Sequence, residues 1–202
     1  MKVKAVVFDL GKVLVDFDYS IAARKLAENA SNPASEIQKM LDHSPLLYRF
    51  ESAGMTNQEF YEAFRREAGF GGDFDLFAAA FGDIFSEMPE MIRFQQQLRS
   101  RRVPTYILSN TNDIAIGHIR RNFPFFANFD GYVMSYEQAA LKPHAPIYEA
   151  AERMIGARGQ ELVFIDDRAE NCEGAARLGW RTICHRDAAE TIPFIESLLI
   201  GR

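Results

Sequence analysis

Short, strongly apolar runs recur along the chain, and the first of them lies close to its start. Residues 3–8 (VKAVVF) form such a run, which closes at Asp9 and Gly11. A continuous apolar run of this kind is typical of a strand that is covered on both faces, as in a parallel sheet. Comparable runs follow only much later, at 103–108 (VPTYIL), 162–165 (LVFI) and 182–184 (TIC), with a weaker one at 131–134 (GYVM).

Helical patterns separate these later runs. Residues 91–101 and 113–122 carry apolar side chains at helical spacing, and residues 146–155 begin with a proline and end at Gly156. Proline near the first turn and glycine just past the last turn are ordinary helix boundaries. Strands and helices that alternate along the chain indicate an α/β fold with a doubly wound parallel sheet.

The stretch between the first two strands has a different pattern. Residues 18–86 show helical periods and many aromatic residues, and Asn32-Pro33 and residues 69–72 divide them into four or five predicted helices with no strand. A helical block inserted after the first strand predicts a cap over the carboxyl edge of the sheet, where α/β domains bind ligands. We therefore expect a core domain at 1–17 and 87–202 and a helical cap domain at 18–86.

Composition and charge narrow the class of protein. The 202 residues are 48% apolar and 25% charged, with a net charge of −5. This acidic balance argues against nucleic-acid and anionic-membrane partners, which need a positive surface. Neither a membrane-spanning run nor a signal peptide is evident. The two cysteines, Cys172 and Cys184, fall in segments predicted to be buried. We expect a soluble cytoplasmic protein, either monomer or homodimer.

Polar residues stand where predicted strands end. Asp9 ends the first strand, and Ser109 and Asn110 end the second and lead into a helix. A hydroxyl and backbone N–H groups at a helix N-terminus can bind an anion. Each residue also has an ordinary structural interpretation, because Asp caps turns and Ser or Asn caps helices.

Charged residues follow at the next two transitions. Lys142-Pro143 precedes a predicted helix, and a lysine held there can reach a phosphate as a point charge, although it can equally be a solvated side chain. Asp166 and Asp167 end an apolar strand. Adjacent carboxylates in such a place repel each other unless a cation compensates, and hard oxygen ligands suit Mg²⁺.

Taken in order, Asp9, Ser109, Lys142 and the pair Asp166-Asp167 resemble the four motifs of the haloacid dehalogenase (HAD) superfamily. The helical insert resembles its C1-type cap, so the resemblance covers essentially the whole chain. The segments FDLGKVLVDFD, LSNTND, LKPHAPIYEAA and FIDDRAENCEGAARLGW are most similar to a bacterial subgroup of small sugar-phosphate phosphatases. That subgroup includes an α-glucose-1-phosphate phosphatase with the same Asp-Leu-Gly opening.

This resemblance implies roles for individual residues. Asp9 would attack phosphorus and form an aspartyl-phosphate. Ser109 and Asn110 would hold phosphate oxygens, and Lys142 would neutralise charge on Asp9 and on the phosphoryl group. Gly11 would complete the phosphate-binding set through its backbone.

The resemblance also implies a magnesium site. Asp9, the backbone carbonyl of Gly11 and Asp167 would bind Mg²⁺, with Asp166 as a further ligand or as a partner of the ligands. Asn171 matches a position that often supports the metal ligands. Magnesium would screen the repulsion between an anionic nucleophile and an anionic substrate.

One departure concerns proton transfer. Most phosphatases of this superfamily carry a second Asp two residues after the nucleophile as general acid and base, and this chain has Gly11 there. Such help is typically worth about 10²- to 10⁴-fold in rate. Our hypothesis is a substrate with a good leaving group, such as an anomeric hydroxyl, with water or a cap residue moving the proton. Asp16, Asp18 and His43 are candidates for that cap residue.

The cap is expected to select the substrate. Residues 47–56 (LYRFESAGMT) form a helix end and turn that would face the site. Arg49 and Glu51 would contact sugar hydroxyls or else be surface charges. Lys12, just past the nucleophile, would likewise either face the site or point to solvent.

The function predicted from the sequence is a Mg²⁺-dependent phosphatase acting on a small phosphorylated metabolite, such as a hexose 1-phosphate. A haloacid dehalogenase is one alternative, because Tyr148 lies six residues after Lys142, although a C–Cl bond needs no cation and the acid pair 166–167 argues for phosphate. Phosphonate hydrolysis would need a cap lysine, such as Lys39. A catalytically silent phosphate-binding protein is the third alternative, and Gly11 alone favours it.

Overall fold

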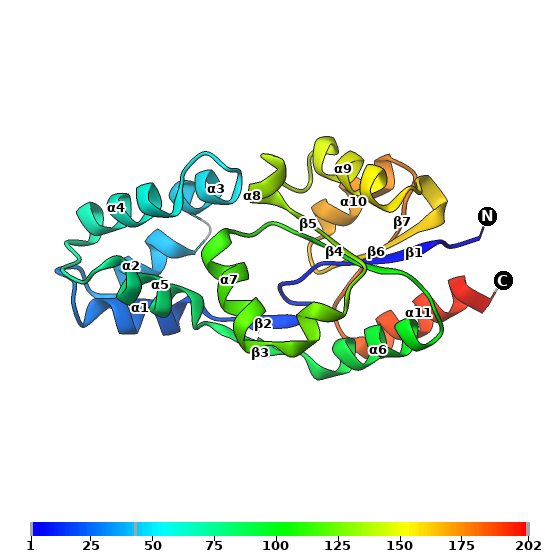
Figure 1. Ribbon diagram of the computed structural model, residues 1–202, viewed down its shortest axis with the longest axis horizontal. Coiled ribbons are helices and arrows are strands. Elements are labelled where there is room, and N and C mark those ends of the chain that lie inside the picture. Colours follow the sequence, from blue (N-terminus) through cyan, green and yellow to red (C-terminus); the bar gives the residue numbers. More distant parts are fainter. Residues whose placement is uncertain (1, 43, 201–202) are drawn as a thin grey trace.

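A five-stranded parallel sheet forms the centre of the computed structural model, which describes residues 2–42 and 44–200 (Figure 1). The strand order is β5-β4-β1-β6-β7, and every neighbouring pair is parallel. The doubly wound parallel sheet predicted from the sequence is confirmed, with each apolar run forming one strand. The strands are β1 (Ala5–Phe8), β4 (Thr105–Ser109), β5 (Gly131–Met134), β6 (Leu162–Asp166) and β7 (Arg181–Cys184).

Helices cover both faces of this sheet, which explains why its strands are apolar throughout. In β1, Val6 and Phe8 belong to the hydrophobic cluster on one face, whereas Ala5 and Val7 belong to the cluster on the other. Successive side chains of a strand point to opposite faces, so both sets must be apolar. The first face carries α6 (Pro89–Ser100), α7 (Asp113–Asn122) and α11 (Ala188–Ile200), and the second carries α9 (Ala145–Ile155) and α10 (Ala169–Arg177).

Three short elements complete the core. They are α8 (Ser135–Gln138) and the 3₁₀ turns η1 (Pro124–Asn128) and η2 (Gly159–Glu161). Of the two cysteines, Cys172 is buried, whereas Cys184 is only partly buried because it ends the edge strand β7. The prediction that both cysteines lie in buried segments is therefore correct for Cys172 only. No helix within the described ranges is both long and apolar enough to cross a membrane.

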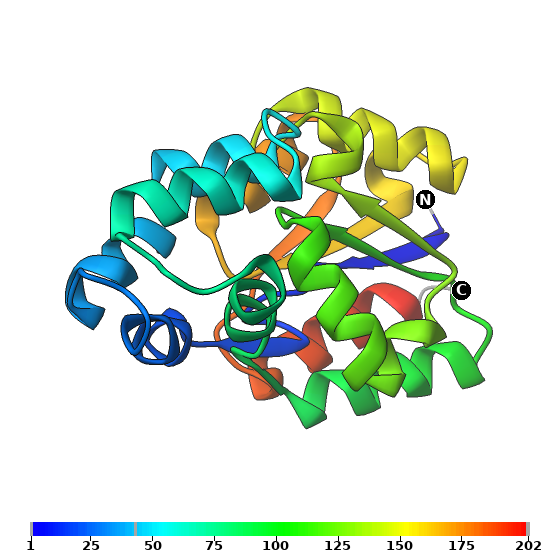
Figure 2. The ribbon, with the colours of Figure 1, turned by 60° about the vertical axis from the view of Figure 1, so that its left-hand side comes forward.

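Five helices form a second layer beyond the carboxyl ends of the strands (Figures 1 and 2). Their aromatic residues pack together, as expected from the sequence; Phe60 stacks on Phe50 at 4.3 Å between ring centroids and meets Phe77 and Phe81 edge-on. Thr56 opens one of these helices with a capping box to Glu59, which fixes its start. The helices are α1 (Tyr19–Ala27), α2 (Ala34–Leu41), α3 (Pro45–Glu51), α4 (Asn57–Ala68) and α5 (Phe74–Gly82).

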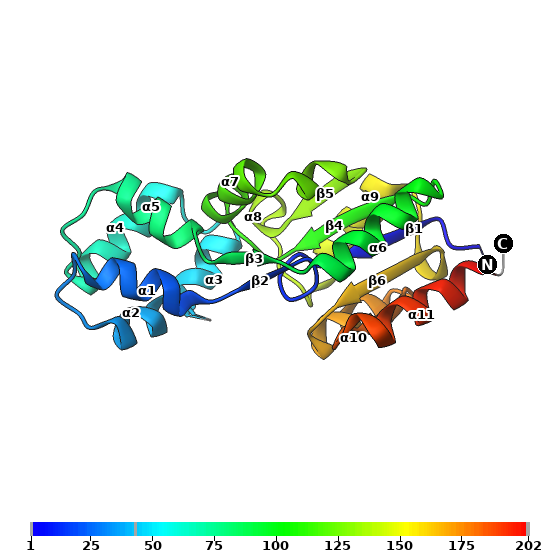
Figure 3. The ribbon, with the colours of Figure 1, turned by 90° about the horizontal axis from the view of Figure 1, so that it is seen from below.

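A two-stranded ribbon joins this helical layer to the sheet domain (Figure 3). Strand β2 (Val15–Phe17) pairs antiparallel with β3 (Phe85–Glu87). The prediction that 18–86 contains no strand is therefore wrong for Phe85 and Ser86. Strands of three residues are too short to show alternation, and only their pairing across the insert makes them strands. The proposed domain boundaries fall at this ribbon.

Candidate active site

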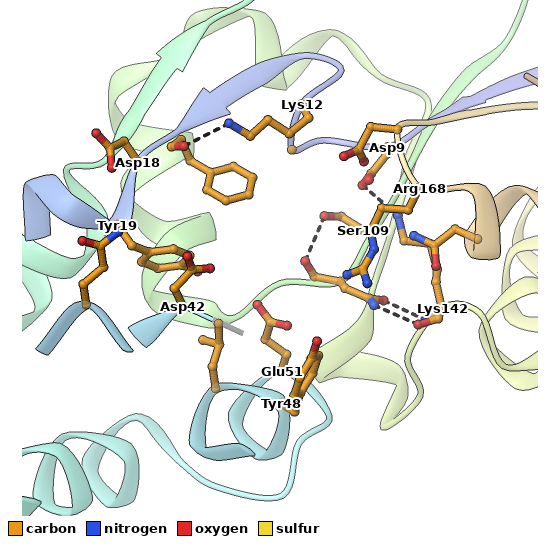
Figure 4. Close-up of a pocket in the computed structure, with 17 residues that line it drawn as sticks. Asp9, Lys12, Asp18, Tyr19, Asp42, Tyr48, Glu51, Ser109, Lys142 and Arg168 are labelled. Atoms are coloured by element: carbon orange, nitrogen blue, oxygen red, sulfur yellow. Dashed lines mark hydrogen bonds and ion pairs between the residues drawn. The ribbon is translucent and has the colours of Figure 1, made fainter. Parts of the chain in front are cut away.

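A pocket of about 500 Å³ lies between the carboxyl edge of the sheet and the helical layer (Figure 4). Its core side is formed by the residues that follow β1, β4 and β6, together with the turn before α9. Its cap side is formed by β2, α1, α2 and α3. The structure thus brings together the site residues predicted from the sequence that lie at or just after strand ends, namely Asp9, Gly11, Ser109, Asn110 and Asp167, and Lys142 from the turn before α9.

Asp9 is fixed at the end of β1 by bonds to its neighbours. Its backbone N–H donates to the carbonyl of Ile165 at 2.8 Å, which continues the β1–β6 pairing by one residue. Its carboxylate Oδ1 accepts from the backbone N–H of Leu10 at 2.7 Å and lies 2.8 Å from the ammonium of Lys142. Because both contacts fall on Oδ1, the carboxylate is held in one orientation.

Lys142 is 4% exposed and is held from both its backbone and its ammonium. The ammonium donates to the carbonyl of Leu108 at 3.1 Å and to Asp166 at 2.6 Å, besides its contact with Asp9. The side-chain amide of Asn110 grips the lysine backbone, accepting from its N–H at 2.8 Å and donating to its carbonyl at 3.0 Å. The Asn110 amide, which the sequence had led us to expect on phosphate oxygens, therefore positions Lys142.

Asp166 differs from its neighbour Asp167 in its surroundings. The Asp166 carboxylate is fully buried, and it accepts from Lys142 on one oxygen and from the Arg168 N–H and the Asn171 amide, both at 2.9 Å, on the other. Asp167 lines the pocket and is only partly buried. One carboxylate oxygen from each of Asp9, Asp166 and Asp167 lies within 4.8 Å of the others. Asp166 thus organises the site, while Asp167 faces the pocket.

The electrostatics of this cluster favour the binding of a cation. Burial raises the pKa of Asp9 to about 8, against the lowering effect of Lys142, and the negative charge of Asp166 adds to the rise. Burial and then Asp166 also raise the pKa of Asp167. Although burial disfavours its charged form, Asp166 and Asp9 raise the pKa of Lys142, which keeps the ammonium charged. Three clustered carboxylates, only two of which the ammonium contacts, form a donor set that fits a hard divalent cation such as Mg²⁺.

Metal removal should therefore make stability depend on pH. Without a cation the folded-state pKa of Asp9 is raised from 3.8 to about 8, so its contribution to stability is complete below about pH 3.8 and is lost as the pH rises through about 8. We expect the melting temperature in EDTA to fall over this range, and Mg²⁺ to raise it more at pH 8 than at pH 5. Thermal unfolding with Mg²⁺ or EDTA at both pH values measures this, and equal Mg²⁺ effects at the two would contradict it.

Gly11 lies so close to the Phe17 ring that a side chain at this position requires the ring to move. A Cβ atom at this position would lie 2.8 Å from Cε1 of the Phe17 ring, which is inside van der Waals contact. Phe17 lies on β2 and lines the pocket. The space that a second acid would need beside Asp9 is therefore filled by an aromatic ring.

The charged residues after Gly11 all have partners near them in the chain. Lys12 lines the pocket, forms an ion pair with Asp16, and lies 4.7 Å above the Phe17 ring. The hydrogen bond from Lys12 lowers the pKa of Asp16. Asp18 caps α1, and its hydrogen bonds from Ser20 lower its pKa. Both acids thus favour the ionised form, and His43 lies outside the described residues.

Helix α3 presents different residues to the pocket from those expected. Tyr48 and Glu51 line it, whereas Arg49 is exposed and does not. Residues three apart share one face of a helix, so the helix that turns Tyr48 and Glu51 inward turns Arg49 away. Arg168, which sequence reasoning missed, also lines the pocket and pairs with Glu170 at 2.5 Å. Its position directly after Asp166-Asp167 is the sequence feature from which this pocket residue could have been predicted.

Tyr148 lies in the core. Its side chain is fully buried against Phe164 and Trp180, and its hydroxyl donates to the carbonyl of Asn171 at 2.8 Å. It does not line the pocket. The Lys–Tyr spacing that favoured a dehalogenase therefore serves packing in this structure.

A doubly wound sheet that carries an aspartate, a lysine and an acid pair at its carboxyl edge, beneath a helical cap, defines an α/β enzyme with a carboxylate-based site. The family model for haloacid dehalogenase-like hydrolases matches residues 3–179, and the chain belongs to this family. The superfamily predicted from the sequence is confirmed, while the sugar-phosphate subgroup stays a prediction.

Solved structures support the same assignment. A HAD family enzyme from Bacteroides thetaiotaomicron is 25% identical, with a TM-score of 0.83 over 97% of this chain and 99% of that one. A predicted HAD-like family hydrolase from Porphyromonas gingivalis is 27% identical, with a TM-score of 0.83 over 98% of each chain. L-2-haloacid dehalogenase from Xanthobacter autotrophicus shares the fold at 20% identity, with a TM-score of 0.66 over 89% of this chain and 76% of that one.

One curated relative is much longer. The mouse protein acyl-CoA dehydrogenase family member 10 is 24% identical over 208 residues. The match covers 97% of this chain but only 19% of the relative. The chain therefore corresponds to a small part of that protein.

Proposed function

We propose that this chain is a Mg²⁺-dependent phosphatase that hydrolyses a small phosphomonoester through an aspartyl-phosphate on Asp9. The observation that carries the proposal is the cluster of Asp9, Asp166 and Asp167, with Lys142 paired to the first two, which fits a divalent cation and a phosphoryl group together. The Bacteroides thetaiotaomicron enzyme has also been crystallised in complex with magnesium and inorganic phosphate, in a form 26% identical to this chain with a TM-score of 0.81, covering 91% of this chain and 94% of that one.

The chain's own groups have distinct roles in this reaction. Lys142 at 2.8 Å and the Leu10 N–H at 2.7 Å hold Oδ1 of Asp9, which orients the carboxylate that attacks phosphorus. Ser109 and Asn110 line the pocket at the end of β4, so the Ser109 hydroxyl and the Asn110 backbone N–H are the groups that bind phosphate oxygens. The Asn110 side chain acts on the substrate through Lys142, whose backbone it clamps at both ends. Lys142 neutralises the charge that develops on the transferring group.

The residues that would hold the metal are Asp9, the carbonyl of Gly11 and Asp167, with Asp166 and Asn171 fixing the geometry around them. Asp166 has this positioning role because Lys142, Arg168 and Asn171 already occupy its oxygens. When bound, Mg²⁺ supplies positive charge that screens the two anions from each other. Substitution of such supporting residues typically costs about 10- to 100-fold in metal affinity or activity.

The pocket favours a small, polyhydroxylated substrate such as a hexose 1-phosphate. Its volume of about 500 Å³ suits a metabolite, and Gln38, Asp42, Glu51 and Arg168 give its outer wall hydrogen-bonding groups. The chain's net charge of −5 disfavours nucleic acid and anionic membranes as partners. We propose a cytoplasmic enzyme that is a monomer or a homodimer.

Phosphate release from a panel of phosphorylated metabolites and p-nitrophenyl phosphate, with Mg²⁺ or EDTA, tests this function. We expect turnover that requires Mg²⁺ and that is highest for sugar 1-phosphates. Equal rates on simple alkyl phosphates would contradict the sugar preference. No release from any phosphate by the folded protein would contradict the phosphatase and favour the silent binder. Chloride release from 2-haloacids, a reaction for which Tyr148 is out of place, would favour the dehalogenase.

A further inference from the structure

Glu51 is a carboxyl group in the pocket that the reaction described above does not use. It is the last residue of α3 and comes one helical turn after Tyr48. Figure 4 shows the two side chains directed from the cap into the pocket, opposite Asp9 and on the side of Ser109. Two core cations, Lys142 and Arg168, interact electrostatically with Glu51 across this space.

The proposed reaction needs a group that donates a proton in its first step and accepts one in its second. When Asp9 displaces the leaving group, the departing oxygen of an alkyl phosphate needs a proton, and the water that later attacks the aspartyl-phosphate must lose one. The position two residues after Asp9 is Gly11, and the Phe17 ring fills the space beside it. A side chain that transfers this proton therefore has to come from another element.

The acids near the nucleophile are unsuited to this task. Lys12 holds Asp16, and Ser20 holds Asp18, in the ionised form. Asp167 is assigned to the metal. Glu51 differs from these residues because burial raises its pKa to about 7, against the lowering effects of Lys142 and Arg168. A carboxyl group that titrates near neutrality can both give and take a proton at physiological pH.

We propose, on the basis of the phosphatase function above, that Glu51 is the acid–base residue of this site. In the first step, an Asp9 oxygen bonds to phosphorus, the bond from phosphorus to the leaving oxygen breaks, and that oxygen takes the Glu51 proton and departs as an alcohol. In the second step, the Glu51 carboxylate accepts a proton from water as the water oxygen bonds to phosphorus. The bond from phosphorus to Asp9 then breaks, which releases inorganic phosphate and restores both carboxyl groups.

This assignment places the acid on the cap and the nucleophile on the core. The chemistry is then complete only when α3 lies over the sheet edge, as it does here. Tyr48 interacts with Arg168 across the same gap, which joins the two sides next to Glu51. An open cap would leave Asp9 able to bind metal and phosphate but without a proton donor.

The pH dependence follows from the groups around Glu51. Lys142 and Arg168 face it from the core, Tyr19 and Asp42 from α1 and the end of α2, and Tyr48 from its own helix. The acid must be protonated for the first step, so kcat/KM should fall as the pH rises through about 7.

The test compares Glu51→Gln with the wild type and with Glu67→Gln, an exposed cap residue outside the pocket. Glutamine keeps the shape and a hydrogen bond but cannot transfer the proton. On a sugar phosphate we expect kcat to fall about 10²- to 10³-fold with little change in KM, and the high-pH limb to disappear. With p-nitrophenyl phosphate, whose leaving group needs no proton, we expect one equivalent of p-nitrophenolate in a burst, followed by slow turnover. Glu51→Asp should recover part of the rate and the high-pH limb, and thermal unfolding checks that each variant is folded.

Other outcomes overturn the proposal. A raised KM with unchanged kcat and pH profile would make Glu51 a substrate-binding residue only. The same kinetic signature in Asp42→Asn, with Glu51→Gln unaffected, would assign the proton to Asp42. In both cases the wild type still releases phosphate, so the phosphatase function stands. A wild type without phosphatase activity would instead overturn the proposed function together with this role of Glu51.

Discussion

Asp9→Asn is expected to abolish turnover, with kcat reduced on the order of 10⁵-fold or more, because the amide cannot form the aspartyl-phosphate. The substitution is nearly isosteric, and the bonds from Leu10 and Lys142 fall on one oxygen that the amide retains. It also removes a charge from a cluster in which burial raises the pKa of Asp9 to about 8. We therefore expect the metal-free variant to be at least as stable as the wild type at pH 8.

Steady-state phosphate release and thermal unfolding together check this prediction. Asp75→Asn, an exposed acid in the first turn of α5, is the matched control and should change neither quantity. Acid quenching during turnover should trap a phosphorylated wild-type protein and no phosphorylated Asp9→Asn. Residual activity within about 10-fold of wild type would exclude Asp9 as nucleophile.

Lys142→Met is expected to have the second largest effect, because it changes both activity and stability. The ammonium is the cation that contacts the carboxylates of both Asp9 and Asp166. Removing one partner from such a buried cluster typically costs about 3–5 kcal/mol of unfolding free energy. Loss of a charge that stabilises the transition state typically costs about 10²- to 10³-fold in kcat.

The stability loss should depend on pH. In metal-free protein without the lysine, protonation of Asp9 relieves its repulsion with Asp166, so the loss should be smaller at pH 5 than at pH 8. Urea unfolding at both pH values measures the difference. Lys39→Met is the control: this lysine is exposed on α2 and does not line the pocket. Loss of activity in Lys39→Met would revive the phosphonate-hydrolase alternative.

The sequence was informative where local pattern determines structure. Asp9, Ser109 and Asp166 were predicted to converge because each ends an apolar strand, and the carboxyl ends of parallel strands share one edge of the sheet. The five strands of the parallel sheet were predicted from their apolar runs, and the helical insert from the helical spacing of its apolar residues.

The sequence could not show which side of a helix faces the pocket, or which residues far apart in the chain contact each other. Arg49 and Glu51 are two residues apart on one short helix, and only packing decides which of them faces the pocket. The grip of the Asn110 amide on Lys142 joins residues 32 positions apart. The pairing of β2 with β3 likewise spans the whole insert.

The contact between Gly11 and Phe17 has a consequence for the engineering of this site. An aspartate that arises at position 11 meets the aromatic ring, because even its Cβ would lie 2.8 Å from Phe17. The ring has to move before the acid can be accommodated. Because that ring also lines the pocket, installing a second aspartate by mutation would reshape the wall next to the nucleophile.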